Sequence, residues 1–409
     1  MNTFDAFALP SSLLDRLAAI SYNTPTPIQA KTIPIGISGR DILGTSRTGS
    51  GKTAAFIIPL IVHLINHPGD RALVLAPTRE LALQIARFAH SLLPKESRIY
   101  SVSLIGGQFI GRQIDQLRRN PALVVATPGR LCDHLDRGTI KVDNVRFLVL
   151  DEADCMLNIG FSQQLNRIAD ALPKQRQTLM FSATMEKNII ALAQTYLSNP
   201  ERVEVGSVKA ATTNVHQKAI FTTRGDKYGE LLKALQERQG SIIIFAKTRV
   251  STEKLCYKLE ADGEKAIFLN GGLSQSKRGR VVRIFKEGKK RILVATDVAA
   301  RGIDIQNIAH VINYDLPQSP EDYIHRVGRT GRAGASGAAL SLITSDDYPL
   351  LHAMKKELDL KIEGIEQMPE MPMPKRGRRR GNSNSNSGWK SGGRSRSRWK
   401  RNDKPFKRY

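Results

Sequence analysis

Short apolar runs rich in β-branched residues alternate with amphipathic stretches along most of the 409-residue chain. Such runs occupy residues 71–76, 122–126, 146–150 and 178–181 in a first block, and 241–245, 265–269, 291–295, 310–314 and 339–343 in a second. Between them, stretches such as 80–93 and 227–239 carry leucines at helical spacing with polar residues opposite. Continuous apolar strands that alternate with helices are typical of parallel sheets covered on both faces. The pattern predicts an α/β fold with two domains in tandem, which the length also favours.

The boundaries of these blocks are expected where large aliphatic residues become rare. The polar stretch from Glu201 to Gln217 is the expected linker, and we predict domains at residues 1–205 and 217–370. Residues 371–409 are rich in Arg, Gly and Ser, and such a composition predicts a disordered tail.

The predicted tail concentrates the positive charge of the chain. Of a net charge of +24, residues 372–409 contribute +13, with 14 Lys and Arg against one acid, Asp403. Four aromatic residues are interleaved with this charge: Trp389, Trp399, Phe406 and Tyr409. Aromatic rings among arginines suit base stacking and phosphate pairing, so we expect a sequence-independent RNA-binding arm. A merely solubilising terminus is the alternative.

The sequence also argues against several classes of protein. It has no run of about 18 apolar residues, so no membrane span is expected. Its first residues lack a basic segment followed by an apolar one, so we expect a cytoplasmic protein. Cys132, Cys155 and Cys256 are too far apart along the chain to predict a disulfide framework or a zinc cluster. The positive charge instead indicates a polyanionic partner such as nucleic acid.

A glycine-rich loop, Ser46 to Thr53, follows a short apolar strand and opens a helix. Its backbone N–H groups can cradle a polyphosphate, while Lys52 reaches the terminal phosphates and the Thr53 hydroxyl ligates magnesium. Ser46 stands where the strict phosphate-loop pattern has glycine, and residues 49–54 also fit the glycine pattern of a dinucleotide-binding fold. The lysine favours the phosphate loop, because a dinucleotide site needs no cation at a terminal phosphate.

An acidic segment, Asp151 to Asp154, directly follows one of the predicted strands. A carboxylate at the end of a buried strand can hold magnesium through water, and we assign this role to Asp151. The neighbouring Glu152 can polarise the water that attacks a terminal phosphate. Taken alone, such a segment is more often an exposed turn, but together with Lys52 and Thr53 it indicates nucleotide hydrolysis.

Four motifs in this order closely resemble those of the DEAD-box ATP-dependent RNA helicases. They are the phosphate loop, Asp151-Glu152-Ala153-Asp154, Ser182-Ala183-Thr184, and the segment from His325 to Arg332. The resemblance covers about residues 4–345. It implies two RecA-like domains with ATP in the cleft between them.

The resemblance implies a nucleotide-binding set made of Phe4, Tyr22, Gln29, Thr48, Gly49, Ser50, Gly51, Lys52, Thr53 and Asp304. Gln29 is implied to read the adenine edge, because an amide offers a donor and an acceptor side by side. Phe4 and Tyr22 are implied to pack around the base, although both are as typical of ordinary core aromatics. Asp304 is implied to lie near the ribose.

The implied catalytic set is Lys52, Asp151, Glu152, Arg329 and Arg332, with Thr53 and Asp151 holding Mg²⁺. Arg329 and Arg332 belong to the second domain and are implied to act as arginine fingers on the phosphate bound by the first, an effect worth about 10³–10⁵ in rate. Four further residues are implied to couple hydrolysis to strand separation: Ser182, Thr184, His325 and Arg326.

RNA contacts are implied at small residues, glycines and arginines that follow predicted strands. They are Pro77, Thr78, Arg79, Gly106, Gly107, Thr127, Pro128, Gly129, Arg130, Gln275, Arg278 and Thr296. None of these offers a set of groups that reads bases, so the predicted grip is on the RNA backbone and independent of sequence. Ordinary turn chemistry is the alternative for the glycine and proline pairs.

These assignments predict an RNA-dependent ATPase that uses ATP and Mg²⁺ to unwind short RNA duplexes and to remodel RNA or ribonucleoprotein by closure of two domains. A DNA-directed helicase or translocase with the same two domains is one alternative. An RNA-annealing factor with an idle ATP site is another. RNA is the expected partner. Members of the family act in ribosome assembly and in RNA decay, so proteins of either pathway are candidate protein partners, and the sequence favours neither. Nothing in it requires more than a monomer.

Overall fold

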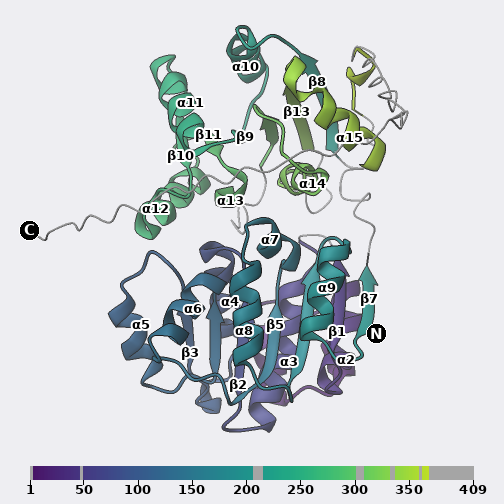
Figure 1. Ribbon diagram of the computed structural model, residues 1–409, viewed down its shortest axis with the longest axis vertical. Helices are drawn as coiled ribbons and strands as arrows, with labels where there is room; N and C mark the ends of the chain where they lie inside the picture. The colour runs from purple at the N-terminus through teal and green to yellow at the C-terminus, as the bar shows by residue number, and fades with distance from the viewer. Residues whose placement is uncertain are drawn as a thin grey trace, which may run out of the picture. The chain divides into compact units, whose positions relative to one another are not determined.

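The computed structural model describes residues 3–46, 49–205, 215–300, 308–331, 337–358 and 362–367. The predicted tail at 371–409 and three of the predicted site residues, Thr48, Asp304 and Arg332, lie outside the described residues. The described part contains two sheets, and each strand pair within them is parallel (Figure 1). None of the described helices has both the length and the apolarity needed to cross a bilayer.

The first sheet has the strand order β3-β4-β2-β5-β6-β1-β7. Its strands are β1 (Ile42–Ser46), β2 (Arg71–Leu75), β3 (Ser101–Leu104), β4 (Leu123–Ala126), β5 (Val145–Leu150), β6 (Gln177–Ser182) and β7 (Glu201–Val205). The helices of this half are α1 (Ser11–Ala19), α2 (Pro27–Ile37), α3 (Lys52–Asn66), α4 (Arg79–Leu92), α5 (Ile110–Leu117), α6 (Pro128–Asp136), α7 (Ala153–Asn158), α8 (Ser162–Ala171) and α9 (Lys187–Tyr196), with short 3-10 turns at Phe4–Phe7 and Lys95–Ser97.

Both faces of this sheet are buried, as the continuous apolar runs predict. In β5, Phe147 and Val149 belong to one hydrophobic cluster, while Leu148 and Leu150 belong to another. Successive side chains of a strand point to opposite faces, so the two clusters lie on the two faces of the sheet. Helices therefore cover the sheet on both sides, and polar functional groups are left to the strand ends.

The second sheet has the strand order β10-β11-β9-β12-β13-β8. Its strands are β8 (Val215–Phe221), β9 (Ile242–Phe245), β10 (Ala266–Leu269), β11 (Ile292–Ala295), β12 (His310–Asn313) and β13 (Gly337–Ile343). The helices of this half are α10 (Lys227–Gln236), α11 (Arg249–Ala261), α12 (Gln275–Lys286), α13 (Asp297–Ala300), α14 (Pro320–Val327) and α15 (Tyr348–Leu358), with 3-10 turns at Ser345–Asp347 and Ile365–Gln367. Alternate residues of β9 again divide between two hydrophobic clusters.

The predicted linker from Glu201 to Gln217 is wrong at both of its ends. Residues 201–205 form β7, which pairs with β1, and Val215 begins β8. Both are edge strands of their sheets, as is the unpredicted β3. Each has a face that is only partly buried, so polar side chains alternate with apolar ones and no continuous apolar run marks the strand.

The order of the strands decides which loops meet. In a parallel sheet the carboxyl ends of all strands lie on the same side of the sheet, where ligands bind. In the first sheet β5, β6 and β1 are consecutive neighbours, and so are β3, β4 and β2. β5 leads into the acidic segment, β6 into the Ser-Ala-Thr segment and β1 into the phosphate loop. The other three strands lead into the residues predicted to contact RNA.

Candidate functional site

The phosphate loop joins β1 to α3, and its lysine points back toward the end of the strand. The buried Lys52 side chain donates from Nζ to the carbonyl oxygen of Ser46 at 3.0 Å. Ser46 and Ser50 share a hydroxyl hydrogen bond of 2.9 Å across the loop. Gly49 and Gly51 both have positive φ, at 81° and 94°, which an L side chain rarely adopts. These two bonds and the two glycine conformations define the shape of the described part of the loop.

Gln29 holds this loop against α2. Its Nε2 donates to the carbonyl oxygen of Gly51 at 3.1 Å, and its Oε1 accepts from the backbone N–H of Thr26 at 2.9 Å. A Cβ added to Gly51 would lie 2.5 Å from Nε2 of Gln29, so only glycine fits at this contact. An amide has two N–H donors and two acceptor lone pairs, so each end of Gln29 has capacity for one more bond. The predicted reading of adenine by Gln29 is compatible with these bonds and stays a prediction.

Asp151 lies at the end of β5, buried beside the phosphate loop. Its backbone N–H donates to Leu75 in β2, and its Oδ1 accepts from the backbone N–H of Glu152 at 3.0 Å. Burial raises the pKa of this carboxyl to about 7, while the nearby positive charge of Lys52 acts in the opposite direction. A carboxylate that is costly to ionise when alone is well suited to a bound cation.

Glu152 is held in a backbone conformation that glutamate rarely adopts. Its φ is 51°, in the left-handed region, and it immediately precedes α7. Such positions are costly and cluster at functional sites, where the surrounding structure fixes them. The side chain of Glu152 is partly exposed, whereas its neighbours Asp151 and Ala153 are buried.

Asp154 connects the acidic segment to the Ser-Ala-Thr segment, a role that the sequence analysis missed. Its Oδ1 accepts from the backbone N–H of Cys155 at 2.8 Å, and its Oδ2 accepts from the backbone N–H of Ala183 at 2.9 Å. Ser182 in turn accepts, through Oγ, the backbone N–H of Thr184 at 3.2 Å. A second aspartate three residues after Asp151 was the available signal, but its partner lies 29 residues away and on another strand.

The residues predicted to contact RNA in the first half come together at one end of the sheet. They follow β2 (Pro77, Thr78, Arg79), β3 (Gly106, Gly107) and β4 (Thr127, Pro128, Gly129, Arg130). Thr78 caps α4 by accepting the backbone N–H of Leu81, and Thr127 precedes the first turn of α6. Two helix N-termini with their backbone N–H groups therefore lie at neighbouring strand ends, an arrangement suited to phosphate groups.

The side chain of Arg79 lies over the two glycines that follow β3. A Cβ added to Gly107 would lie 2.2 Å from Nη1 of Arg79, and one added to Gly106 would lie 3.2 Å from Nη2. The two glycines thus allow close approach of the guanidinium, and Gly107 also has a positive φ of 77°, which an L side chain rarely adopts. Arg130, from the next loop, donates to the carbonyl oxygen of Gln108 at 3.4 Å.

The second half repeats this arrangement and shows a residue that the sequence analysis missed. Thr248 caps α11 after β9, and the next residue, Arg249, lies over Gly271, where an added Cβ would be 3.1 Å from Nη2. This matches Thr78 and Arg79 in the first half. The signal was present in the sequence as a Thr-Arg pair after a strand in each block.

The predicted RNA-contacting residues of the second half lie on neighbouring strand ends. Gln275 and Arg278 belong to the first turn of α12, which follows β10, and Thr296 follows β11. The buried guanidinium of Arg278 donates to the carbonyl oxygens of Asn270 at 3.0 Å and Ala299 at 3.2 Å. These bonds fix the two loops relative to each other.

Arg326 is fixed within its own half of the molecule. Its Nε and Nη2 donate to the two carboxylate oxygens of Asp297, at 2.5 and 2.7 Å, and its Nη1 donates to Oδ1 of Asn313 and to the carbonyl oxygen of Asp315. His325 precedes it on α14, and the backbone N–H of Arg329 donates to the carbonyl of Arg326. Arg326 therefore positions the segment that leads to the predicted arginine fingers.

Phe4 and Tyr22 belong to the hydrophobic core. Phe4 is almost fully buried, with its ring centroid 5.9 Å from that of Phe7 and 6.4 Å from that of Tyr22. Tyr22 also packs against Phe88, at 5.6 Å. The alternative of core aromatics thus describes what these rings do in the fold, and contact with a base stays a prediction.

Comparison with known proteins places this geometry in a family. The DEAD/DEAH box helicase family matches residues 26–192, and the helicase conserved C-terminal domain matches residues 226–334. The DEAD-box ATP-dependent RNA helicase CshA of Bacillus subtilis (strain 168) is 42% identical over 368 residues, which cover 89% of this chain and 74% of that protein.

Solved structures agree. S. cerevisiae Dbp5 bound to RNA and ADP BeF3 is 30% identical and superposes with a TM-score of 0.79, covering 89% of this chain and 95% of that one. Mss116p bound to ssRNA and AMP-PNP is 31% identical with a TM-score of 0.79, covering 88% and 78%.

These matches define a nucleotide-dependent helicase built from two RecA-like domains. The chain belongs to the DEAD-box ATP-dependent RNA helicases, and its enzymatic activity is that of an ATP-hydrolysing RNA helicase.

Proposed function

We propose that this helicase separates short RNA duplexes locally, through ATP-driven closure of its two RecA-like domains. The observation that carries the proposal is the carboxylate of Asp154 in the acidic segment, which accepts hydrogen bonds from the backbone N–H groups of Cys155 and of Ala183 in the Ser-Ala-Thr segment. A displacement of the acidic segment at the terminal phosphate is transmitted to residues 182–184 through the hydrogen bond between Asp154 and Ala183. Hydrolysis and RNA binding are thereby coupled through loops at the carboxyl ends of strands of the first sheet.

The proposed chemistry assigns one task to each group at the phosphate end. Lys52 holds the terminal phosphates, Glu152 accepts the proton of the attacking water, and Arg329 and Arg332 stabilise the charge that develops on the transferred phosphoryl group. Thr53 and Asp151 would hold Mg²⁺, and their hard oxygen donors fit that ion. When bound, Mg²⁺ neutralises charge on the phosphates.

The proposed RNA grip uses the strand ends of both halves. Helix N-termini and the guanidinium groups of Arg79 and Arg249 can contact phosphates, and the described residues at these strand ends offer no set of groups that reads base edges. This supports binding independent of sequence, and the RNA-bound state of two structural neighbours supports RNA as the nucleic acid. Closure then bends one strand so that it no longer fits a duplex, and hydrolysis reopens the domains.

Replacement of Glu152 by glutamine tests the chemical assignment. Because the amide cannot accept the water proton, we expect kcat for ATP hydrolysis to fall by about 10²–10⁴-fold while ATP binding is kept. Glu237→Gln, at a side chain that is 75% exposed, is the matched control and should hydrolyse ATP like the wild type. Retained turnover in Glu152→Gln would remove this residue from its role.

A second experiment separates the proposal from its two rivals. ATP hydrolysis is measured with magnesium, alone and with single-stranded RNA or DNA of equal length. Stimulation by RNA alone supports the proposal, and equal stimulation by DNA favours a translocase acting on either nucleic acid. Strand annealing without ATP, together with no turnover, is the signature of a non-enzymatic factor.

A further inference from the structure

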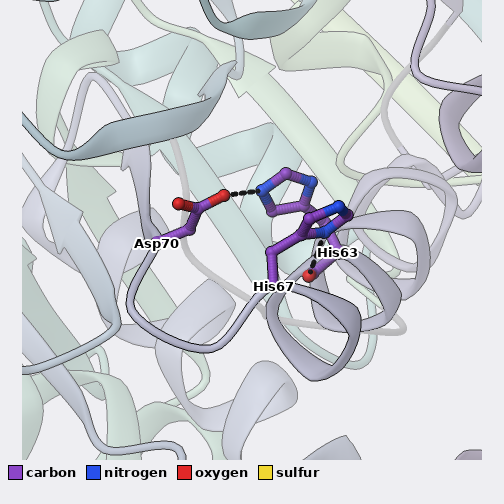
Figure 2. A group of neighbouring side chains, drawn as sticks. All are labelled: His63, His67 and Asp70. Atoms are coloured by element: carbon purple, nitrogen blue, oxygen red, sulfur yellow. Dashed lines mark hydrogen bonds and ion pairs between the residues drawn. The ribbon is translucent and has the colours of Figure 1, made fainter.

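A cluster of two histidines and one aspartate lies at the end of α3 that is remote from the phosphate loop. His63 is in the last turn of the helix, His67 follows it, and Asp70 directly precedes β2 (Figure 2). One ligating atom from each of the three side chains can be chosen so that all lie within 4.8 Å of one another. His63 is eleven positions after Lys52 on the same helix, which is about 17 Å along a helix axis, so this cluster is separate from the nucleotide site.

The hydrogen bonds of the cluster hold the three side chains together. Nε2 of His63 and Oδ2 of Asp70 are 2.9 Å apart, and Nδ1 of His67 donates to the carbonyl oxygen of His63 at 3.0 Å. Because that nitrogen of His67 is a donor, the other ring nitrogen of neutral His67 carries a lone pair. The two imidazole rings are stacked, with centroids 4.5 Å apart and an interplanar angle of 24° (Figure 2).

We propose that His63, His67 and Asp70 form a binding site for a divalent transition metal ion, with Zn²⁺ as the preferred ion. Two imidazole nitrogens and one carboxylate oxygen are the ligands of three-ligand zinc sites, with water completing the tetrahedron. Histidines four residues apart at a helix end are neighbours on one face. Mg²⁺ prefers sites made of oxygen ligands, so it does not compete here.

Two of the three ligands, His63 and Asp70, need little movement to admit the ion, and the exposed His67 ring turns out of its stacked position to join them. Two ligands at 2.0–2.1 Å from a tetrahedral zinc are about 3.3 Å apart, close to the separation of His63 and Asp70. The ion takes the place of the proton between these two groups, and the proton moves to the other nitrogen of His63. The side chains of His63 and Asp70 are 18% and 29% exposed and His67 is exposed, so the ion has a path from solvent.

The other side of His63 is supported by the core. Its ring lies 5.4 Å from that of Phe147 in β5, which is fully buried. This packing limits the motion of one ligand, while the turn from residue 66 to 70 carries the other two. A bound ion would therefore fasten this turn to the helix, and the stability of the folded state should rise with the logarithm of the zinc concentration once that exceeds Kd.

The test is a zinc titration of the full chain without an affinity tag, in competition with a chromophoric chelator. The wild type should bind one Zn²⁺ per chain with micromolar or tighter affinity, and an excess of Mg²⁺ should not displace it. His67→Ala removes an exposed ligand and should weaken binding at least tenfold. His90→Ala, at an exposed histidine in the last turn of α4, is the matched control and should bind like the wild type.

Two further readouts keep the result specific. With Co²⁺, the site should give an absorption spectrum without a thiolate charge-transfer band, because the three buried cysteines take no part. Zn²⁺ should raise the thermal midpoint of the wild type and of His90→Ala but not of His67→Ala. The proposal is overturned if the wild type binds no zinc in this range, or if His67→Ala and His90→Ala bind it equally well.

Discussion

Three buried polar side chains in this helicase, those of Asp154, Gln29 and Arg326, link separate segments of the chain. Asp154 joins the acidic segment to Ala183, and Gln29 joins α2 to the phosphate loop. Arg326 uses all three guanidinium nitrogens within its own half and lies over the ring of Phe245, 4.8 Å from its centroid. Each of these residues was singled out by motif or by its neighbours, but its partner lies far away along the chain. Residue type was therefore predictable, whereas the contact was not.

Removal of the Arg326 side chain should destabilise the second half. The Arg326→Ala variant leaves the carboxylate of Asp297 and the amide of Asn313 without their cation, so we expect a loss of about 3 kcal/mol in the free energy of unfolding. Urea denaturation followed by circular dichroism measures this loss. Arg283→Ala, whose side chain is 71% exposed, should stay within about 0.5 kcal/mol of the wild type. Equal urea midpoints for both variants would contradict the positioning role of Arg326.

At the level of secondary structure, burial decides which elements could be predicted. Strands with both faces buried, such as β5 and β9, carry continuous apolar runs, and the predicted boundaries agree with the observed ones to within about two residues. The edge strand β7 falls within the expected linker because its sequence is polar and poor in large aliphatic residues, and Val203 is the one residue of the strand that is buried. Its strand character comes from hydrogen bonds to β1, which no local pattern reports. The same applies to the site: motifs located the loops, but the strand order brought them together.

The strand β1, which lies between β6 and the edge strand β7, offers a test of how packing positions the phosphate loop. Gly44 pairs with Phe181 of β6, and a Cβ added to Gly44 would lie 2.6 Å from that buried ring. Gly44→Ala should therefore cost about 1–3 kcal/mol through overpacking. The end of β1 should shift as well, so that ATP binds more weakly.

Thermal unfolding and ATP titration of Gly44→Ala measure both effects. Gly229→Ala is the matched control, since no atom lies within 4 Å of a Cβ added there, on the exposed face of α10. Helix propensity predicts that this control is unchanged or up to about 1 kcal/mol more stable. Wild-type stability and ATP affinity in Gly44→Ala would show that Phe181 yields without moving the strand.

For the whole molecule, the positive charge is distributed unevenly along the sequence. Residues 372–409 carry +13 of the net +24, so just under half of the excess is left for the first 371 residues. The strand-end sites proposed for RNA offer only a few side chains and a few backbone N–H groups. These short-range contacts fix the geometry of the bound RNA but contribute little to its affinity. Long-range attraction to RNA is then expected to come mainly from residues beyond 371.

A chain that ends at Met371 should therefore bind RNA more weakly, and its affinity should depend less on salt. On single-stranded RNA each phosphate contact contributes about 0.7 to the slope of log affinity against log salt, so loss of several contacts is readily measured. ATP hydrolysis without RNA should be unchanged, because Lys52 and Glu152 are retained. In the full chain, replacing Trp389 and Trp399 by alanine should lower affinity through lost stacking but keep the salt slope. If the shortened chain shows the slope of the full chain, the phosphate contacts lie on the strand ends and the basic tail is not an RNA-binding arm.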